Sequence, residues 1–470
     1  MLRFLNPFIE KRVAKSFASI SHVELQNNLS SKRPNNALQS YLKSNPSRTF
    51  LLFSDLLRRN TSLLDSYSLL YAIKACTKKA GAIEGKQVHT LVLKLGYEPI
   101  IFLQTSLVNM YSAAGNLADA RRMFEEMPTR NVICWTSLVS AYVDNQEANA
   151  ALEMFRRMQK ENVKPDHVTL TVALSACADL GALEMGEWIH GYITQKSELN
   201  ADLYLKNALI NMYVKCGDIG RAKELFDNLK RKDVTSWTSM IVGYAVHGQA
   251  EDALRLYAAM EKESKSMTNK KCSHKAHLIS PNDVTFVGVL MACSHAGMLE
   301  EGKKYFRIMT EEFGLKPRLP HYGCMVDLFC RKGMLKDACE FILAMPVEPN
   351  AIIWRTLLGA CTIHGNLDLA AEAYNKLLQL EESVVGDDVL MSNIYAAKEM
   401  WNEKLKVRDE IKQRRTPGYS TIEVGSCIYE FVSADDHHPL ASDIYGVLDH
   451  LIGNMRTYSY TSQFSTLTDT

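Results

Sequence analysis

The chain has 470 residues, with 54 Lys and Arg against 53 Asp and Glu, and a formal net charge of +1. This balance excludes a strongly basic, histone-like protein and a protein with an acidic tail. No apolar run reaches the about 18 residues that a transmembrane helix needs, so we expect no membrane partner. The eleven Cys residues, an odd number in a long chain, argue against a secreted disulfide framework and favour a reducing compartment.

The start of the chain is basic and amphipathic. Residues 1–60 carry ten Lys and Arg but three Asp and Glu, whereas the rest of the chain carries 44 and 50. Apolar residues recur at every fourth position on one helical face, at Leu5, Ile9, Val13 and Phe17. A basic, Ser-rich and acid-poor start is typical of an organelle transit peptide, although an ordinary first helix of the fold is the alternative. We therefore predict a transit peptide and linker over residues 1–46 and a mitochondrial location, with the chloroplast as the alternative.

Three short motifs recur along the rest of the chain. Ala-Cys ends at Cys76, Cys177, Cys293 and Cys361, Met-Tyr begins at Met110 and Met212, and similar stretches begin at Trp135, Trp237 and Trp354. Cys76 and Cys177 are 101 residues apart, and Trp135 and Trp237 are 102 apart. This interval divides into three repeats of about 31 to 35 residues, a period typical of helical arrays. The recurrent Cys, Trp and Tyr residues are most simply core residues, and His89 and His190 are expected to be packed or capping.

Each repeat has the pattern of two amphipathic helices. In residues 132–166, two apolar stripes at helical spacing flank a polar break; they are Trp135, Leu138, Val139 and Tyr142, then Ala151, Leu152, Phe155 and Met158. Pro residues such as Pro128 and Pro165 separate successive repeats, because Pro cannot continue a helix. One helix pair cannot bury its own apolar face, so the pairs must stack. We therefore predict an all-α fold, an α-solenoid of tandem helix-turn-helix repeats.

One repeat contains an insertion. The interval from Cys177 to Cys293 is 116 residues, and the surplus lies in Lys262–Ser280, a Lys- and Ser-rich stretch without an apolar period. We expect a polar loop there. Cys272, His274 and His277 have loosely metal-like spacing, but a flexible loop is the better interpretation than a zinc site.

The cycle of three repeat types resembles the plant pentatricopeptide repeat proteins of the PLS subclass, and this resemblance implies a right-handed superhelix. Residues 66–100, 167–202 and 283–318 are similar to L repeats, residues 101–131, 203–233 and 319–350 to S repeats, and residues 132–166 and 234–282 to P repeats. The string Trp354-Arg355-Thr356-Leu357-Leu358 and the later Pro417-Gly418-Tyr419-Ser420 resemble the C-terminal extension of the family. The predicted domains are a repeat array at 47–350, E-type extension repeats at 351–424, a partial E+ extension at 425–450 and a tail at 451–470. Tetratricopeptide repeats, the rival solenoid, keep one 34-residue period and a Trp…Leu-Gly…Tyr placement that is missing here.

The resemblance implies binding of single-stranded RNA, with one base read per repeat. In the family, the fifth and the last residues of a repeat read the base, and the second residue sandwiches it. The reading pairs here are Thr105 with Asn131, Thr136 with Asp166, Asn207 with Asp233, and Thr238 with Asn282. The sandwiching residues are Phe102, Ile133, Tyr204 and Thr235. The alternative role for any one of the polar residues is a helix cap or a solvated side chain.

The family's pairings imply a base order for these repeats. Thr with Asn resembles an adenine reader, Thr with Asp a guanine reader and Asn with Asp a uracil reader, which gives 5′-A-G-n-U-A-3′. Leu70 and Val287, the fifth residues of two L repeats, offer no hydrogen bond to a base. Because the chain after residue 60 is net negative, we expect base contacts rather than bulk charge to supply the affinity.

The chain lacks the motifs of the family's zinc deaminase, which needs His-x-Glu and Pro-Cys-x-x-Cys. Cys-x-x-Cys does not occur, and the one His-x-Glu, at His22, lies in the leader. We therefore predict no catalytic residue, no metal and no cofactor. The resemblance implies a site-recognition factor for C-to-U RNA editing, which recruits a deaminase-bearing or accessory protein through residues 351–450. The alternatives are an organellar splicing, stability or processing factor and, in a different class, a protein-binding scaffold.

Overall fold

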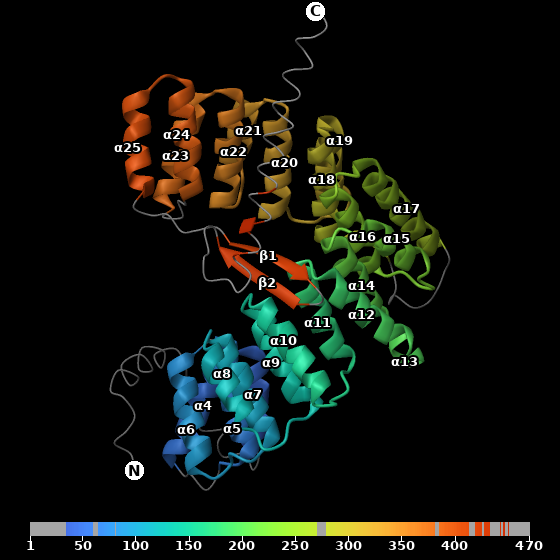
Figure 1. Cartoon of the computed structure of the whole chain (residues 1–470), viewed down its shortest axis with the longest axis vertical. Coiled ribbons are helices and arrows are strands. Elements are labelled where there is room, and N and C mark those ends of the chain that lie inside the picture. Colours follow the sequence, from blue (N-terminus) through green and yellow to red (C-terminus); the bar gives the residue numbers. More distant parts are fainter. Residues whose placement is uncertain are drawn as a thin grey trace, which may run out of the picture. The chain divides into compact units, whose positions relative to one another are not determined.

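The computed structural model describes residues 34–59, 64–79, 81–269, 279–380, 385–412, 419–424 and 427–432, together with residues 442, 445, 446 and 450. The chain divides into two compact units, residues 1–231 and 232–470. Each unit is a succession of helix pairs joined by short turns (Figure 1). Among the described residues, no helix combines the length and apolarity needed to cross a membrane.

In the first unit, the first helix of each pair packs against the first helix of the next pair, as α5 does on α7 and α7 on α9. The helices are α3 (Pro34–Ser44), α4 (Pro46–Arg59), α5 (Ser66–Lys79), α6 (Ala82–Lys94), α7 (Ile101–Ala113), α8 (Leu117–Glu125), α9 (Val132–Asp144), α10 (Ala148–Lys160), α11 (His167–Leu180), α12 (Leu183–Thr194), α13 (Ser197–Asn200), α14 (Leu203–Lys215) and α15 (Ile219–Asp227). The first helices therefore form one continuous layer of this unit.

The second unit repeats this arrangement and adds a small sheet. Its elements are α16 (Val234–Val246), α17 (Ala250–Asn269), α18 (Asp283–Ala296), α19 (Leu299–Arg307), the π-helical turn η3 (Ile308–Glu312), α20 (Leu319–Arg331), α21 (Leu335–Leu343), α22 (Ala351–His364), α23 (Leu367–Gln379), α24 (Val385–Ala397), α25 (Trp401–Lys412), β1 (Tyr419–Val424) and β2 (Cys427–Val432). Again α16, α18, α20, α22 and α24 pack one on the next. The predicted α-solenoid is confirmed.

The recurrent residues occupy the core, as predicted. Cys76, Cys177, Cys293 and Cys361 are buried, and burial raises the pKa of the Cys76 and Cys293 thiols to about 12. These thiols are therefore protonated and unreactive at neutral pH. The two histidines lie at the L-to-S junctions, where Nδ1 of His89 is 2.8 Å from the Tyr111 hydroxyl and Nδ1 of His190 is 2.9 Å from that of Tyr213.

Three features differ from the sequence prediction. Helix α3 lies inside the predicted transit peptide and linker, residues 1–46, but Leu38 and Leu42 are buried and α3 packs on α4 and α5, so the packed helices among the described residues include this segment. Helix α17 continues through 262–269, where we expected a loop, supported by an ion pair between Lys265 and Glu261 one turn apart. Residues 270–278, with Cys272, His274 and His277, lie outside the described residues; among the described residues no group of metal-ligating side chains gathers.

The third difference is the β1–β2 hairpin, an antiparallel pair in register from Tyr419 opposite Val432 to Val424 opposite Cys427. Strand β1 lies at the end of the predicted E-type extension, residues 351–424, and strand β2 lies in the predicted partial E+ extension, residues 425–450. The signal was present, because both strands are rich in β-branched and aromatic residues and two residues, Gly425 and Ser426, separate them.

The L-to-S junctions contain a tight fit between glycine and a long side chain. A Cβ atom on Gly186 would lie 2.4 Å from Sδ of Met212, one on Gly85 would lie 2.2 Å from Sδ of Met110, and one on Gly302 would lie 2.4 Å from Cδ2 of Leu328. Met110, Met212 and Leu328 are each the tenth residue of an S repeat. At the two junctions on either side of residues 132–166 the same two positions both carry alanine, Ala120 with Ala141 and Ala151 with Ala176.

We expect Gly186→Ala to destabilise the protein, although alanine favours a helix, because overpacking costs about 1–3 kcal/mol. Gly191→Ala in the same helix is the matched control, since its Cβ atom would meet nothing within 4 Å. Thermal unfolding should show a lower midpoint for Gly186→Ala, an unchanged or higher one for Gly191→Ala, and partial recovery in Gly186→Ala/Met212→Ala. Equal midpoints for the two single variants would contradict the packing argument.

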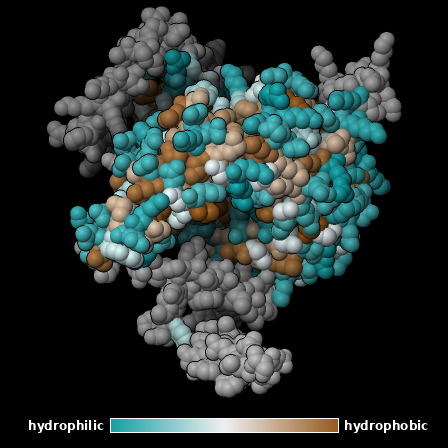
Figure 2. Space-filling model, turned by 90° about the horizontal axis from the view of Figure 1, so that it is seen from above, coloured by the Kyte–Doolittle hydropathy of each residue, from teal (hydrophilic) through white to brown (hydrophobic). Residues whose placement is uncertain are grey.

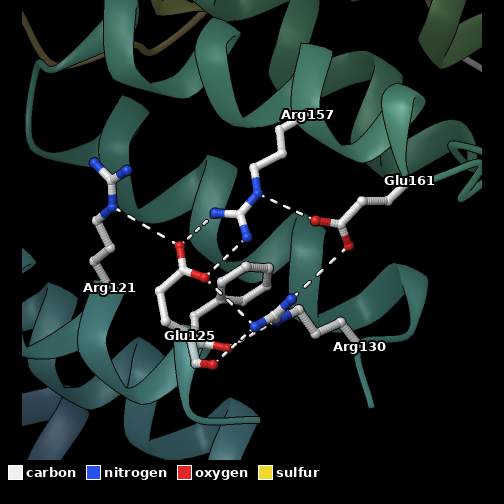
Figure 3. Close-up of polar contacts among 6 residues, drawn as sticks. Arg121, Glu125, Arg130, Arg157 and Glu161 are labelled. Atoms are coloured by element: carbon white, nitrogen blue, oxygen red, sulfur yellow. Dashed lines mark hydrogen bonds and ion pairs between the residues drawn. The ribbon is translucent and has the colours of Figure 1, made fainter. Parts of the chain in front are cut away.

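A charged network ties the second helices of two successive repeats together (Figure 3). The Arg157 guanidinium donates to both oxygens of Glu125 and, through Nε, to Glu161 at 3.1 Å. Arg130 donates to the Phe124 and Glu125 carbonyl oxygens. The hydrogen bond from Arg157 holds the pKa of Glu125 below its usual value. This stabilisation is present above the usual carboxylate pKa and is lost as the pH falls through the lower folded-state value.

Candidate nucleic-acid interface

Apolar side chains form an exposed row at the second residue of the first helices. In the first unit they are Tyr67, Phe102, Ile133, Val168 and Tyr204, and in the second unit Val284 and Ile352. Ile133 is 59% exposed and Tyr204 is 79% exposed, which is unusual for large apolar residues. Figure 2 shows hydrophobic side chains (brown) reaching the surface between hydrophilic ones (teal). The predicted sandwiching residues Phe102, Ile133 and Tyr204 belong to this row, and Thr235 occupies the same exposed position.

Two adjacent members of the row stack on each other. The rings of Tyr67 and Phe102, from successive repeats, have centroids 5.7 Å apart and an interplanar angle of 24°. A flat apolar group could therefore contact two successive repeats at once.

The fifth residues lie deeper than the second residues. Thr105, Asn207 and Thr238 are each 7% exposed, and Thr136 is half-buried. The hydroxyls of Thr105 and Thr136 donate to carbonyl oxygens one turn earlier, of Ile101 and Val132, both at 2.8 Å. A ligand that contacts these polar groups must reach down between the exposed second residues.

The last residue of each predicted reading repeat is the N-cap of the following helix. The side-chain oxygen accepts the backbone N–H three residues on: Asn131 from Cys134 at 3.1 Å, Asp166 from Thr169 at 2.8 Å, Asp233 from Ser236 at 2.8 Å and Asn282 from Thr285 at 2.9 Å. These are the bonds that an N-cap supplies to the orphan donors of a helix start. The helix-cap role that the sequence left open as an alternative is therefore confirmed. The cap hydrogen bond uses Oδ1 of each residue.

Capping also determines what the other side-chain atom can offer. Because Oδ1 of Asn131 and Asn282 accepts an N–H, the second atom of each amide is Nδ2, a donor. For Asp166 the second atom is Oδ2, an acceptor, and the N–H and the hydroxyl of Thr169 both donate to Oδ1. The same cap geometry thus presents a donor in an Asn repeat and an acceptor in an Asp repeat.

The structure also links the fifth and last residues of a repeat through a residue that sequence reasoning missed. Thr169, the third residue of the next repeat, lies 2.6 Å from the Thr136 hydroxyl and donates to Oδ1 of Asp166 at 2.7 Å. In the second unit, Thr285 makes the same link between Thr238, at 2.7 Å, and Asn282, at 2.9 Å. The available signal was a Ser or Thr three residues after an Asp or Asn cap.

The third predicted pair is divided between the units: Asn207 lies in the first and Asp233 in the second. Asn207 lies on α14, and Asp233 begins α16 with a reciprocal capping box. Asn207 is the fifth residue of its repeat and Asp233 is the N-cap of the next helix, as in the other reading pairs.

The extension repeat at 351 uses its fifth position differently. Nε of Arg355 donates to both oxygens of the buried Asp387 carboxylate, at 2.9 and 3.0 Å. Asp387 is the third residue of the following helix pair, so an ion pair replaces the hydroxyl link of the reading repeats. The polar groups of this repeat are engaged in holding the extension together.

These features define a helical-repeat protein in which the repeats 101–131, 132–166 and 203–233 each present an exposed apolar side chain and a deeper polar group. The PPR repeat model matches residues 105–132, 205–234, 235–264, 284–312 and 320–348, the PPR repeat family model matches 130–179, and the E motif model matches 364–423. A pentatricopeptide repeat-containing protein of Arabidopsis thaliana is 34% identical over 459 residues, which cover 96% of this chain and 76% of that protein. The chain belongs to the pentatricopeptide repeat family.

Other relatives are longer than this chain. A chloroplastic/mitochondrial pentatricopeptide repeat-containing protein of Arabidopsis thaliana is 35% identical over 430 residues, 89% of this chain and 65% of that protein, and a chloroplastic one is 38% identical over 393 residues, 82% and 51%. The chain thus spans one half to two thirds of the length of these relatives. The structure of the pentatricopeptide repeat protein PPR10 in complex with an 18-nucleotide psaJ RNA element has a TM-score of 0.59 at 14% identity, over 81% of this chain and 60% of that one. This similarity supports the fold.

Proposed function

We propose that this chain is an organellar protein that binds single-stranded RNA and reads one base per repeat. The observation that carries the proposal is the repeated set of a second-position apolar group, a fifth-position polar group and a cap residue whose outward atom is a defined donor or acceptor. The similar structure of PPR10 contains RNA, and several relatives are named as chloroplastic or mitochondrial. The basic amphipathic start favours the mitochondrion, with the chloroplast as the alternative.

The outward cap atom matches the ring nitrogen of a base. An Asp acceptor suits guanine or uracil, whose Watson–Crick edges carry a ring N–H, whereas an Asn donor suits adenine or cytosine, whose ring nitrogen accepts. This chemistry agrees with the family's pairings for Asp166, Asn131 and Asn282. The proposed element remains A-G-n-U-A.

Because the chain after residue 60 is net negative, binding through base contacts can be distinguished from binding through bulk charge. We expect an RNA with A-G-n-U-A to bind at least tenfold tighter than one with the same bases in another order, as judged by gel shift. The affinity should depend weakly on salt, because stacking and edge contacts rather than counterion release supply it. Equal binding of both RNAs would favour the protein-binding scaffold.

The finer proposal is that the chain selects sites for C-to-U RNA editing and recruits a deaminase-bearing or accessory protein through residues 351–450, contributing no catalytic group itself. The E motif match and the engagement of Arg355 by Asp387 support a non-reading role for this region. Trp401 and Leu405 on α25 also support it. The equivalent residues of α23, Leu367 and Ala371, are partly buried against the core, whereas Trp401 and Leu405 are 55% and 58% exposed.

A splicing, stability or processing factor would use the same reading residues. Sequencing organelle RNA from a plant that lacks this protein separates the possibilities. Loss of conversion at one or a few C positions downstream of the element supports editing, and altered introns, ends or abundance without such a loss supports the alternative.

A further inference from the structure

We propose that the third residue of a repeat is a positioning residue for the base reader formed by the preceding repeat. Thr169, Thr285 and Cys134 hold this position in three repeats. The inference deepens the proposed RNA-binding function and rests on it. These side chains would set the hydrogen-bond direction of both reading residues without touching the base.

The geometry around Thr169 is the best defined. Thr169 is fully buried, and both its backbone N–H and its hydroxyl donate to Oδ1 of Asp166, at 2.8 and 2.7 Å. Its hydroxyl oxygen is also 2.6 Å from that of Thr136. One side chain therefore joins the two predicted readers of residues 132–166.

A hydroxyl has one proton to donate, and this determines the direction of the hydrogen bonds that connect Thr136, Thr169 and Asp166. The Asp166 carboxylate can only accept, so the Thr169 proton points to it. The Thr136 proton must then go to Thr169 or to the Val132 carbonyl oxygen, which is 2.8 Å away. In either case that proton is used within the protein, and Thr136 presents a lone pair outward.

Thr136 and Asp166 would then offer two acceptors side by side. Guanine is the base whose Watson–Crick edge carries two adjacent donors, the ring N1–H and the 2-amino group. With Asn in place of Asp, as in Thr238 and Asn282, the outward pair becomes one acceptor and one donor, which suits the 6-amino group and N1 of adenine. Without the hydroxyl of Thr169, Thr136 would keep the Val132 carbonyl oxygen as its one acceptor within the protein, and its proton could turn to a base instead.

The S repeat at 101–131 provides a natural comparison. Its link is Cys134, whose Sγ lies 3.5 Å from the Thr105 hydroxyl and 3.2 Å from Oδ1 of Asn131. A thiol is a weak donor and a weak acceptor, so it orients Thr105 less firmly than Thr169 orients Thr136. We infer that the base facing Thr105 and Asn131 is read less selectively.

The test is Thr169→Val in the full chain, which keeps the β-branched shape and removes the hydroxyl. The measurement is a competition titration with four RNAs that differ at the base facing Thr136 and Asp166. We expect the preference for guanine over the other bases to fall about tenfold, with RNAs altered at other positions ranked as before. Thr169→Ser should restore the preference, and Thr194→Val, an exposed hydroxyl on α12, should leave it unchanged.

A uniform loss of affinity for all four RNAs, or an unchanged guanine preference, would overturn the inference, because Thr169 would then be structural. Cys134→Ser gives an independent arm if Thr169→Val folds poorly. It should sharpen the preference for adenine at the base facing Thr105 severalfold, and no change there would also count against the inference. Failure of the unaltered protein to bind any of the RNAs would instead refute the proposed function.

Discussion

Asp166→Asn should move the preference of its repeat from guanine to adenine. The amide keeps Oδ1 as the acceptor for the Thr169 N–H and hydroxyl, so the start of α11 is preserved. The outward atom changes from an acceptor to a donor, which suits adenine N1 and opposes guanine N1–H. An edge contact is worth about 1–3 kcal/mol. The affinity for adenine relative to guanine should therefore rise by roughly tenfold or more.

A competition titration with four RNAs that differ at this base measures the effect. The reciprocal variant Asn282→Asp, in the second unit, should convert an adenine preference to guanine and is the matched control for the direction of the change. If Asp166→Asn weakens all four RNAs equally, the residue acts as a helix cap alone and the repeat-by-repeat reading does not apply.

Trp401→Ser combined with Leu405→Ser should abolish editing while leaving RNA binding and thermal stability nearly unchanged. Both side chains are more than half exposed, so their replacement removes little buried apolar area. They lie in the extension, beyond the paired reading residues. The measurements are editing of the target C after the variant is returned to a plant that lacks the protein, and gel shift with the RNA element.

Leu343→Ser is the control, because Leu343 is similarly exposed on α21, outside the extension. Its editing should resemble that of the unaltered protein. Normal editing by the Trp401 and Leu405 variant would show that this face of α25 is not the recruiting surface. Loss of RNA binding together with loss of editing would show that this face of α25 takes part in RNA binding.

The periodic parts of the molecule could be predicted from the sequence because each repeat poses the same packing problem. The burial of Cys177 and Trp135 follows from apolar stripes at helical spacing. The exposure of Ile133 at the second position could not be derived from hydropathy, which would bury it; it came from the resemblance to the family. The reading roles of Thr136 and Asp166 remain predictions.

The remaining features depend on contacts that a one-dimensional pattern does not contain. Helix α3 resembles a leader in composition, and its place in the fold depends on burial of Leu38 against later helices. Thr136 and Thr169 are 33 positions apart in the sequence. Their hydrogen bond depends on the packing of two first helices against each other, which the sequence does not show. The hairpin of β1 and β2 lies where the resemblance to the family implied the end of the extension repeats, and only the β-branched and aromatic residues of its two strands distinguish it from them.

The fit of Gly186 to Met212 has a consequence for how arrays of this kind lengthen and shorten. Placing an S repeat after a P repeat would press its long tenth side chain against an alanine, and placing a P repeat after an L repeat would leave a void above the glycine. Loss or duplication of a single L or S repeat is therefore penalised at the new junction, whereas loss of a P repeat would again place alanine against alanine, as in Ala120 with Ala176. Evolution of the array, and any redesign of it, should accordingly gain or lose L and S repeats together, so that each glycine keeps its long partner.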